Sequence, residues 1–238
     1  MKTTGTPCLY AARTEIIRKG IIRYPHSAFT VKEQRMSIQD YLKAQKLAEK
    51  QQRTAPGEEA RWLPVLEDIL KNYEIEGQIP LGQTEIPLSL IAGTAQSERT
   101  SAFAANFMPL LDYDTEFGNK WSSLCDSVRE VGVNEPIVAF EFMQRFYVAE
   151  GNKRVSVSKY FGAVSIGAVV TRVIPKPDDT DEYKVYSEFM AFHRVSGIYE
   201  IEMEHPGSFP RLMQAIRPAG PEDEADEGKP AQPEPWDD

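Results

Sequence analysis

The chain has 238 residues, which is enough for one ordinary domain with extensions or for two small domains. Its hydrophobic content of 41% can fill a core, and no apolar run approaches the roughly 20 residues of a membrane-spanning helix. The formal net charge of −9 argues against a broad nucleic-acid-binding surface, because neutralisation of phosphates drives most such binding, but it leaves room for a small cationic pocket.

The two ends of the chain carry opposite charge. Residues 1–35 contain seven Lys or Arg and two Glu, and they lack a sustained apolar period. Residues 218–238 contain eight Asp or Glu and one Lys, and they are proline-rich and almost free of aliphatic side chains. We therefore predict a disordered basic N-terminus and a disordered acidic tail. Met36 directly precedes a helix-start pattern and is a second candidate for the start of translation.

Cysteine and histidine usage fits a protein of the reducing cytoplasm. Cys8 and Cys125 make no disulfide framework, and Cys125 falls in a helical pattern as a small buried residue. The polar start of the chain shows no signal peptide. The histidines His26, His193 and His205 are far apart and lack ligand spacing, so we predict no metal site.

The first predicted elements form a helical hairpin over residues 36–78. Its first helix covers residues 37–53, with Ser37 as the N-cap. Its second helix covers residues 58–73, where apolar side chains make one broad face.

Residues 79–176 predict an α+β core in which helices pack on a small mixed sheet. Its expected elements are a strand over 85–91, helices over 101–110 and 115–131, a hairpin of strands 137–142 and 145–149, a helix to residue 161, and a strand over 166–174. A C-terminal helical extension over 177–217 follows, with helices over 181–193 and 208–216 on either side of a short strand over 198–203.

The turn after the strand 145–149 predicts an anion-binding site. The chain turns at Gly151, and a helix begins with Asn152, Lys153 and Arg154 in its first turn. First-turn amides lack intrahelical partners, and the helix dipole adds partial positive charge there. Lysine and arginine add full charges and hydrogen-bond donors. The alternative is an ordinary exposed turn, because short motifs of this kind often mislead.

A second loop has a similar composition. Arg99, Thr100 and Ser101 place a cation and two hydroxyls at the start of the helix predicted over 101–110. The alternative is a capping sequence with an exposed arginine. The two loops form one site only if the fold brings them together.

Five motifs occur in the order found in a known superfamily. They are the strand and loop 86–99, Ser-Val-Arg-Glu-Val-Gly at 127–132, Pro-Ile-Val at 136–138, Phe-Tyr-Val at 146–148, and Gly-Asn-Lys-Arg at 151–154. This series resembles the ParB/sulfiredoxin-like superfamily. Residues 37–216 look like an uncharacterised ParB-like segment of Gram-positive anaerobes, on the strength of residues 107–111 and 150–157. The resemblance implies a bacterial protein of that fold more than it implies an activity.

In ParB proteins the corresponding glycine–arginine box binds a nucleoside triphosphate. The resemblance implies that Gly151, Lys153 and Arg154 hold phosphates, with Mg²⁺ on the nucleotide and residues 99–101 as the opposing loop. Asn152 stands where ParB proteins usually have an acidic residue, which puts hydrolysis in doubt. Sulfiredoxins need a cysteine at that position, so sulfur chemistry of their type is not expected. Roughly forty ordered residues follow the core, too few for the ParB helix-turn-helix.

Four functions stay open from the sequence. The first is a nucleotide triphosphate- or phosphate-binding regulatory module. The second is hydrolysis of a nucleotide or phosphodiester, with Glu98, Glu130 and Glu150 as the nearby acids. The third is nucleic-acid binding without catalysis, through Lys153, Arg154, Lys159 and the basic N-terminus. The fourth is a protein–protein interaction domain without a ligand, with a homo-oligomer or another protein as partner.

Overall fold

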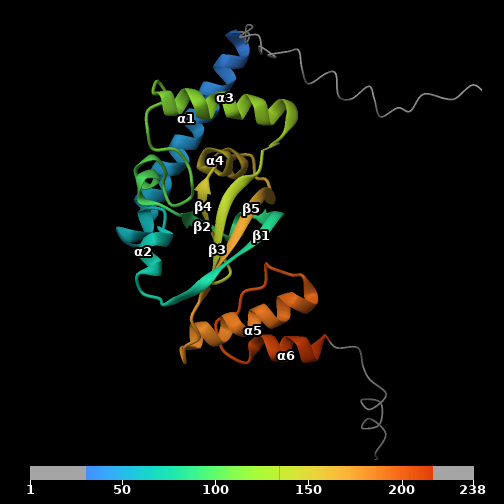
Figure 1. The fold of residues 1–238 in the computed structure, drawn as a ribbon. Helices are drawn as coiled ribbons and strands as arrows, with labels where there is room; N and C mark the ends of the chain where they lie inside the picture. Colours follow the sequence, from blue (N-terminus) through green and yellow to red (C-terminus); the bar gives the residue numbers. More distant parts are fainter. Residues whose placement is uncertain (1–30, 134, 217–238) are drawn as a thin grey trace, which may run out of the picture.

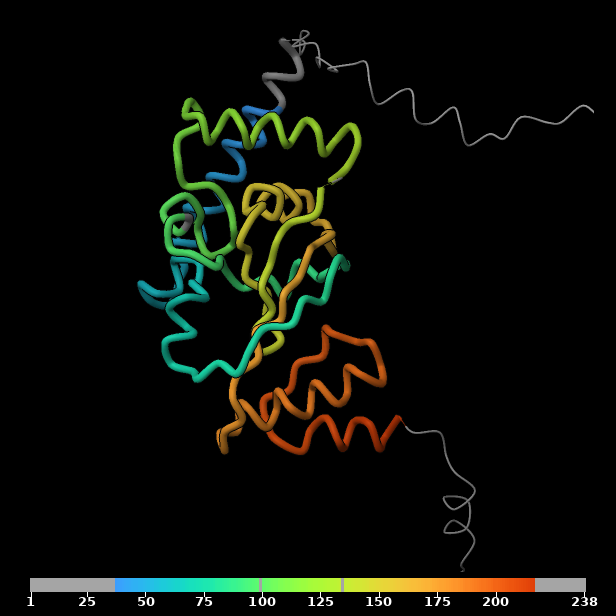
Figure 2. Tube along the Cα trace, viewed as in Figure 1, coloured from blue at the N-terminus to red at the C-terminus, as the bar shows by residue number. Residues whose placement is uncertain are grey.

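The computed structural model describes residues 31–133 and 135–216. The acidic tail predicted over 218–238 and the first 30 residues of the predicted basic N-terminus lie outside this range. The described chain begins at one end of the molecule and finishes at the other (Figures 1 and 2). No helix within the described residues is long and apolar enough to cross a membrane.

A five-stranded mixed sheet forms the centre of the fold, in the order β1-β5-β3-β4-β2. Its strands are β1 (Ile75–Pro87), β2 (Ile91–Thr94), β3 (Ile137–Phe142), β4 (Arg145–Glu150) and β5 (Ser165–Pro175). The pairs β1/β5 and β3/β4 are antiparallel, whereas β3/β5 and β2/β4 are parallel. The predicted α+β class with a small mixed sheet is confirmed.

Six α-helices surround this sheet within the described residues. They are α1 (Val31–Thr54), α2 (Leu66–Leu70), α3 (Glu116–Val131), α4 (Asn152–Tyr160), α5 (Asp181–Ser196) and α6 (Ser208–Ala215). Helices α1, α3 and α4 gather at one end of the sheet, and α5 and α6 lie at the other end (Figure 1). One sheet face is covered by α4 and the irregular segment 88–110, and α2 packs against the other face.

The predicted strand hairpin is confirmed, and its turn explains its register. Met143 and Gln144 both have positive φ angles, of 50° and 64°. Two consecutive residues of positive φ match the twist of the flanking strands, which is why two-residue hairpins favour this geometry. Gln144 then donates its side-chain amide to the carbonyls of Tyr199 and Ile201, at 2.9 and 2.5 Å. The turn therefore also anchors the segment that follows α5.

The predicted helical hairpin is wrong in its second helix. The chain over 58–73 forms only a 3-10 turn, Glu59–Arg61, and the short helix α2. Pro64 lies between them, and a proline removes a helical hydrogen bond and pushes the preceding residue toward extended geometry. The first helix begins earlier than predicted, at Val31, so Ser37 is a buried interior residue and not a cap.

The partner of α1 is α3, not the segment after it. Tyr41 packs edge-on against Trp121, with ring centroids 5.3 Å apart. Asp40 is paired with Arg129 of α3 and accepts a hydrogen bond of 2.8 Å from the Tyr160 hydroxyl of α4. These contacts tie three helices into one layer and fix the position of α4.

The helix predicted over 101–110 is also wrong. A 3-10 helix covers Ser97–Ala102, and the chain then turns irregularly, with Phe107 at a φ of 64°. The Asn106 side chain accepts a hydrogen bond from the Met108 amide at 3.0 Å, which offers the backbone a local turn in place of a helix. The strand predicted over 85–91 is divided between the end of β1, a 3-10 turn and the start of β2.

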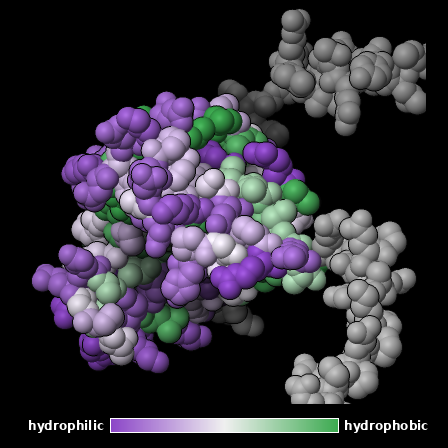
Figure 3. Space-filling view, turned by 90° about the horizontal axis from the view of Figure 1, so that it is seen from below, coloured by the Kyte–Doolittle hydropathy of each residue, from purple (hydrophilic) through white to green (hydrophobic). Residues whose placement is uncertain are grey.

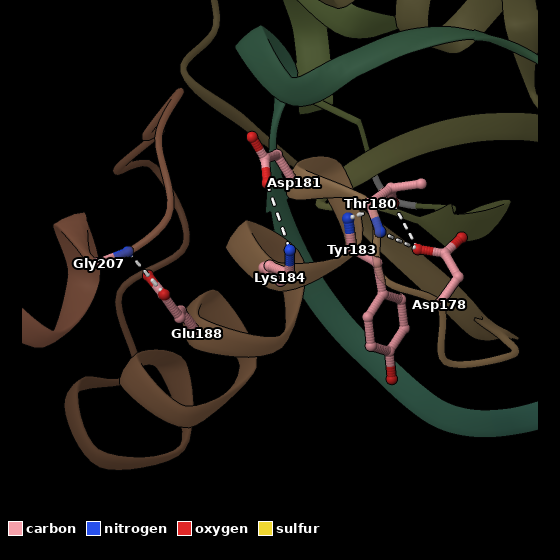
Figure 4. Close-up of polar contacts among 7 residues, drawn as sticks. All are labelled: Asp178, Thr180, Asp181, Tyr183, Lys184, Glu188 and Gly207. Atoms are coloured by element: carbon pink, nitrogen blue, oxygen red, sulfur yellow. Dashed lines mark hydrogen bonds and ion pairs between the residues drawn. The ribbon is translucent and has the colours of Figure 1, made fainter.

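The C-terminal extension is helical as predicted, but residues 198–203 form no strand. Thr180 caps α5 by accepting a hydrogen bond of 3.2 Å from the Tyr183 amide, and Glu188 accepts one of 2.7 Å from the Gly207 amide at the start of α6 (Figure 4). Four buried aromatic side chains join the two helices, namely Tyr186, Phe189, Phe192 and Phe209. Seen from below relative to Figure 1, the surface is mainly hydrophilic, with hydrophobic residues in small patches (Figure 3).

Candidate functional site

The turn between β4 and α4 has the geometry that the sequence predicts. Gly151 has a φ of 102° and a ψ of 20°, in the left-handed region that favours glycine. A Cβ atom at this position would lie 2.6 Å from the Cγ2 atom of Ile137 on β3. Glycine therefore allows both the turn and the close approach of α4 to the sheet.

A pocket of about 350 Å³ opens at the start of α4. Its floor is the chain 149–154, and its wall comes from α3 and the segment before it, through Phe103, Phe117, Lys120 and Leu124. The Trp121 indole donates a hydrogen bond of 2.8 Å to the Ser156 hydroxyl, which holds α3 against α4 behind the pocket.

Three cationic side chains line this pocket. Lys153 and Arg154 come from the first turn of α4, and Lys120 comes from α3. The Lys153 ammonium lies 4.5 Å from the centroid of the Phe117 ring, a cation–π distance. Lys120 forms an exposed ion pair of 2.6 Å with Glu116. Sequence reasoning missed Lys120, because only the packing of α3 on α4 brings it to the site.

Arg154 also has a structural task. Its guanidinium donates to the carbonyl oxygens of Glu135, at 3.3 Å, and Pro136, and it lies 3.5 Å from the Glu135 carboxylate. These contacts hold the segment that enters β3. A guanidinium has five N–H donors, so the contacts do not use all of them.

Asn152 is the least ordinary residue of the pocket. Its side chain is buried, with 7% of the residue exposed, and its Oδ1 atom has no hydrogen-bond partner among the described residues. A buried acceptor without a donor costs about 1–3 kcal/mol. Gly151, at the N-cap of α4, has no side chain that could accept a hydrogen bond from the first-turn amides, and such a helix start favours an anionic acceptor. The pocket is thus lined by the first turn of a helix and by a residue whose buried oxygen has no described partner.

The second predicted loop begins at the same end of the sheet, but its described side chains do not line the pocket. Strands β2 and β4 are parallel neighbours, with Thr94 opposite Val148, so the chain leaves both strands at the same end of the sheet. Phe103 enters the pocket wall, whereas Glu98, Thr100 and Ser101 are not among its described lining residues. The side chain of Arg99 lies outside the described part of the chain. The Thr100 hydroxyl donates to the Ser97 carbonyl at 2.7 Å, as expected of a local turn.

The acidic and thiol groups around the pocket are few. Glu150 is the one carboxylate among its described lining residues. No group of three or more His, Cys, Asp or Glu able to hold a metal ion occurs within the described range. Cys125 is buried in α3, as predicted, and burial raises the pKa of its thiol to about 12. This thiol is neutral at physiological pH and lies outside the pocket lining.

Lys159, on the same helix, points to a different environment. Its ammonium donates a hydrogen bond of 3.1 Å to the Ile91 carbonyl and lies 4.7 Å from the centroid of the Phe107 ring. Burial lowers its pKa from 10.5 to about 8. Lys159 is therefore a packing residue beneath the helix and not part of the pocket.

The lowered pKa of Lys159 predicts a pH-dependent contribution to stability. Between about pH 8 and pH 10.5 the unfolded chain holds a proton that the folded chain has released, so stability rises with pH in this window. We expect the wild type to gain roughly 2–3 kcal/mol relative to Lys159→Met between pH 7 and pH 10.5. Urea denaturation of both proteins across this range measures the difference. A constant difference would contradict the burial of a charged ammonium.

Comparisons with known proteins add little to this geometry. No protein-family model and no curated protein matches the chain. Among solved structures, sulfiredoxin from Arabidopsis thaliana is similar to part of it, at 22% identity over 37% of this chain and 82% of that chain. The TM-score of 0.26 is too low to support a statement about chemistry. The structure itself defines the class, an α+β protein with a cationic pocket at a helix N-terminus.

Proposed function

We propose that the protein binds a phosphate-bearing ligand, a nucleotide in particular, at the start of α4. The observation that carries this proposal is the buried Oδ1 atom of Asn152, which has no described partner and lies beside an uncapped helix start. The first-turn amides, Lys153 and Lys120 favour an anionic group. The Asn152 oxygen calls for a hydrogen donor on the same ligand.

A nucleotide satisfies both requirements. Its phosphates accept hydrogen bonds from the helix amides and the lysines, and a ribose hydroxyl can donate to Asn152. The aromatic rings of Phe103 and Phe117 supply an apolar wall for the rest of the molecule. We propose binding without hydrolysis, in a regulatory role, because Glu150 alone among the described lining residues can act as a base.

A thermal-shift panel tests the proposal. CTP, ATP, GTP, UTP and inorganic phosphate are compared, each with and without Mg²⁺. A ligand at one hundred times its dissociation constant adds about 2.7 kcal/mol of apparent stability. We expect at least one nucleotide to raise the Tm more than phosphate does. A flat panel on folded protein would leave an interaction domain without a ligand as the better explanation.

Asn152→Asp is the sharpest variant for this site. It keeps the shape of the side chain but places a carboxylate beside the bound phosphate, so we expect nucleotide stabilisation to disappear. Asn72→Asp, at an exposed position between α2 and β1, makes the same charge change away from the pocket and should respond as the wild type does. Because a buried carboxylate also lowers the Tm of the free protein, Lys153→Met provides a second test, with affinity reduced about tenfold. Unchanged affinity in both pocket variants would remove the ligand from this site.

A further inference from the structure

A second cavity, of about 490 Å³, lies between the sheet and the C-terminal extension. Its floor includes Phe146 of β4 and Val170 of β5, both buried. One wall comes from residues 84–87 of β1. The other comes from His193 of α5 and from Gly197, Tyr199 and Glu200, which follow that helix. It shares no lining residue with the pocket at α4. Its volume is in the range of small-molecule sites, about 300–1,000 Å³.

The charged groups of this cavity are mainly acidic. Glu85 on β1 accepts a hydrogen bond of 3.0 Å from the Ser165 hydroxyl, and Glu200 accepts one of 3.2 Å from the Tyr199 amide. Among the described residues, no lysine or arginine forms an ion pair with either carboxylate. Arg172 also lines the cavity, but its charge is compensated by the buried Glu141. The cavity therefore offers carboxylates whose charge is not neutralised.

Aromatic rings line the same cavity as these carboxylates. The Tyr199 ring centroid lies 5.3 Å from that of Phe146 and 4.6 Å from that of His193. The His193 Nδ1 atom lies 3.2 Å from the Ile198 carbonyl oxygen, which can only accept, so Nδ1 carries the proton. In the neutral ring Nε2 is then an acceptor. Carboxylates, aromatic faces and an imidazole acceptor are the groups that surround organic cations.

We propose that this cavity binds a small organic cation, an amine or guanidine carried on an apolar stem. The charged group lies at the rim near Glu85 and Glu200, and the stem packs against Phe146 and Val170 on the floor. The Tyr199 ring, which lines the cavity, contributes further attraction for the cation. This site is independent of the nucleotide proposal, because the two cavities have separate linings.

Titration of the full-length protein with matched probes tests the inference. Hexylamine and agmatine represent the proposed class, 1-hexanol has the same apolar stem without charge, and hexanoate reverses the charge. Isothermal titration calorimetry should show binding of at least one cation, with hexanol at least tenfold weaker and hexanoate not binding. Equal affinity for hexylamine and hexanol, or no binding of either cation, would overturn the proposal.

Conservative variants locate the binding site. Glu85→Gln and Glu200→Gln each remove one charge from an exposed side chain and leave its size unchanged, so we expect a loss of at least fivefold in amine affinity. Glu76→Gln changes an exposed glutamate of β1 outside the cavity and should bind amine as the wild type does. Asn152→Asp should also retain amine binding, which separates this site from the pocket at α4. Full amine affinity in the double variant Glu85→Gln/Glu200→Gln would refute the assignment.

Discussion

Glu141→Gln is expected to lower the free energy of unfolding by about 3–5 kcal/mol, the usual cost of breaking a buried ion pair from one side. Glu141 has 0% exposure and is paired with Arg172, which is 9% exposed. Burial alone would lower the pKa of Arg172, but Glu141 and the Tyr199 hydroxyl more than offset it and raise this pKa. The guanidinium therefore remains charged when its partner is neutralised.

The same pair connects the core to the C-terminal extension. Arg172 donates a hydrogen bond of 2.9 Å to the Tyr199 hydroxyl, and Glu141 accepts one of 3.2 Å from the backbone amide of Gln144. Arg145 adds a two-pronged ion pair with Glu202 at the exposed side. Loss of the Glu141 carboxylate should therefore destabilise the sheet and also weaken the contacts that hold the segment after α5.

A double variant gives the control for this prediction. Glu141→Leu/Arg172→Met removes both charges and leaves apolar side chains, so it should be much more stable than Glu141→Gln. Urea denaturation of wild type, single and double variants measures the three free energies. A single-variant loss below about 1 kcal/mol would show that the pair is not desolvated as the structure has it.

The second large effect is expected for Gly151→Ala, with a loss of about 2–5 kcal/mol from left-handed strain and overpacking together. The new methyl group would lie 2.6 Å from the Ile137 side chain, at a φ of 102°. Gly197→Ala is the matched control, because Gly197 is also left-handed, at a φ of 69°, but has no atom within 4 Å of a built Cβ. It should lose only about 1–2 kcal/mol.

Chemical denaturation compares the two glycine variants. Equal losses would mean that strain alone limits the β4–α4 turn and that the approach of α4 to β3 can relax. A larger loss for Gly151→Ala would show that the close packing of Gly151 on Ile137 fixes the position of α4 against the sheet, on which the shape of the pocket depends.

The elements predicted correctly are those with strong local signals. The hairpin 137–149 and helix α4 follow from alternating apolar residues, a two-residue turn and Gly151. The helix predicted over 58–73 had a broad apolar face, but Pro64 overrode it, and the turn at Asn106 lies where a helix was predicted over 101–110. Apolar spacing reports which residues are buried, and it cannot say whether an irregular segment buries them equally well.

Of the residues that line the pocket, the sequence pointed only to those of the turn between β4 and α4. Residues 150–154 are contiguous, so their chemistry was visible in the sequence. Lys120, Phe103 and Phe117 reach the pocket through the packing of α3 on α4. Contacts between residues distant in sequence leave no local pattern, and the structural task of Arg154 was hidden for the same reason.

The most direct test of nucleotide binding is a titration followed by the backbone amide signals of Asn152, Lys153 and Arg154 in ¹⁵N-labelled protein. Direct hydrogen bonds from first-turn amides to phosphate shift these signals strongly. Saturable shifts of all three with a nucleoside triphosphate, absent in Asn152→Asp, are the result we predict. Unmoved signals at these residues, or shifts confined to another surface, would contradict a phosphate site at the start of α4.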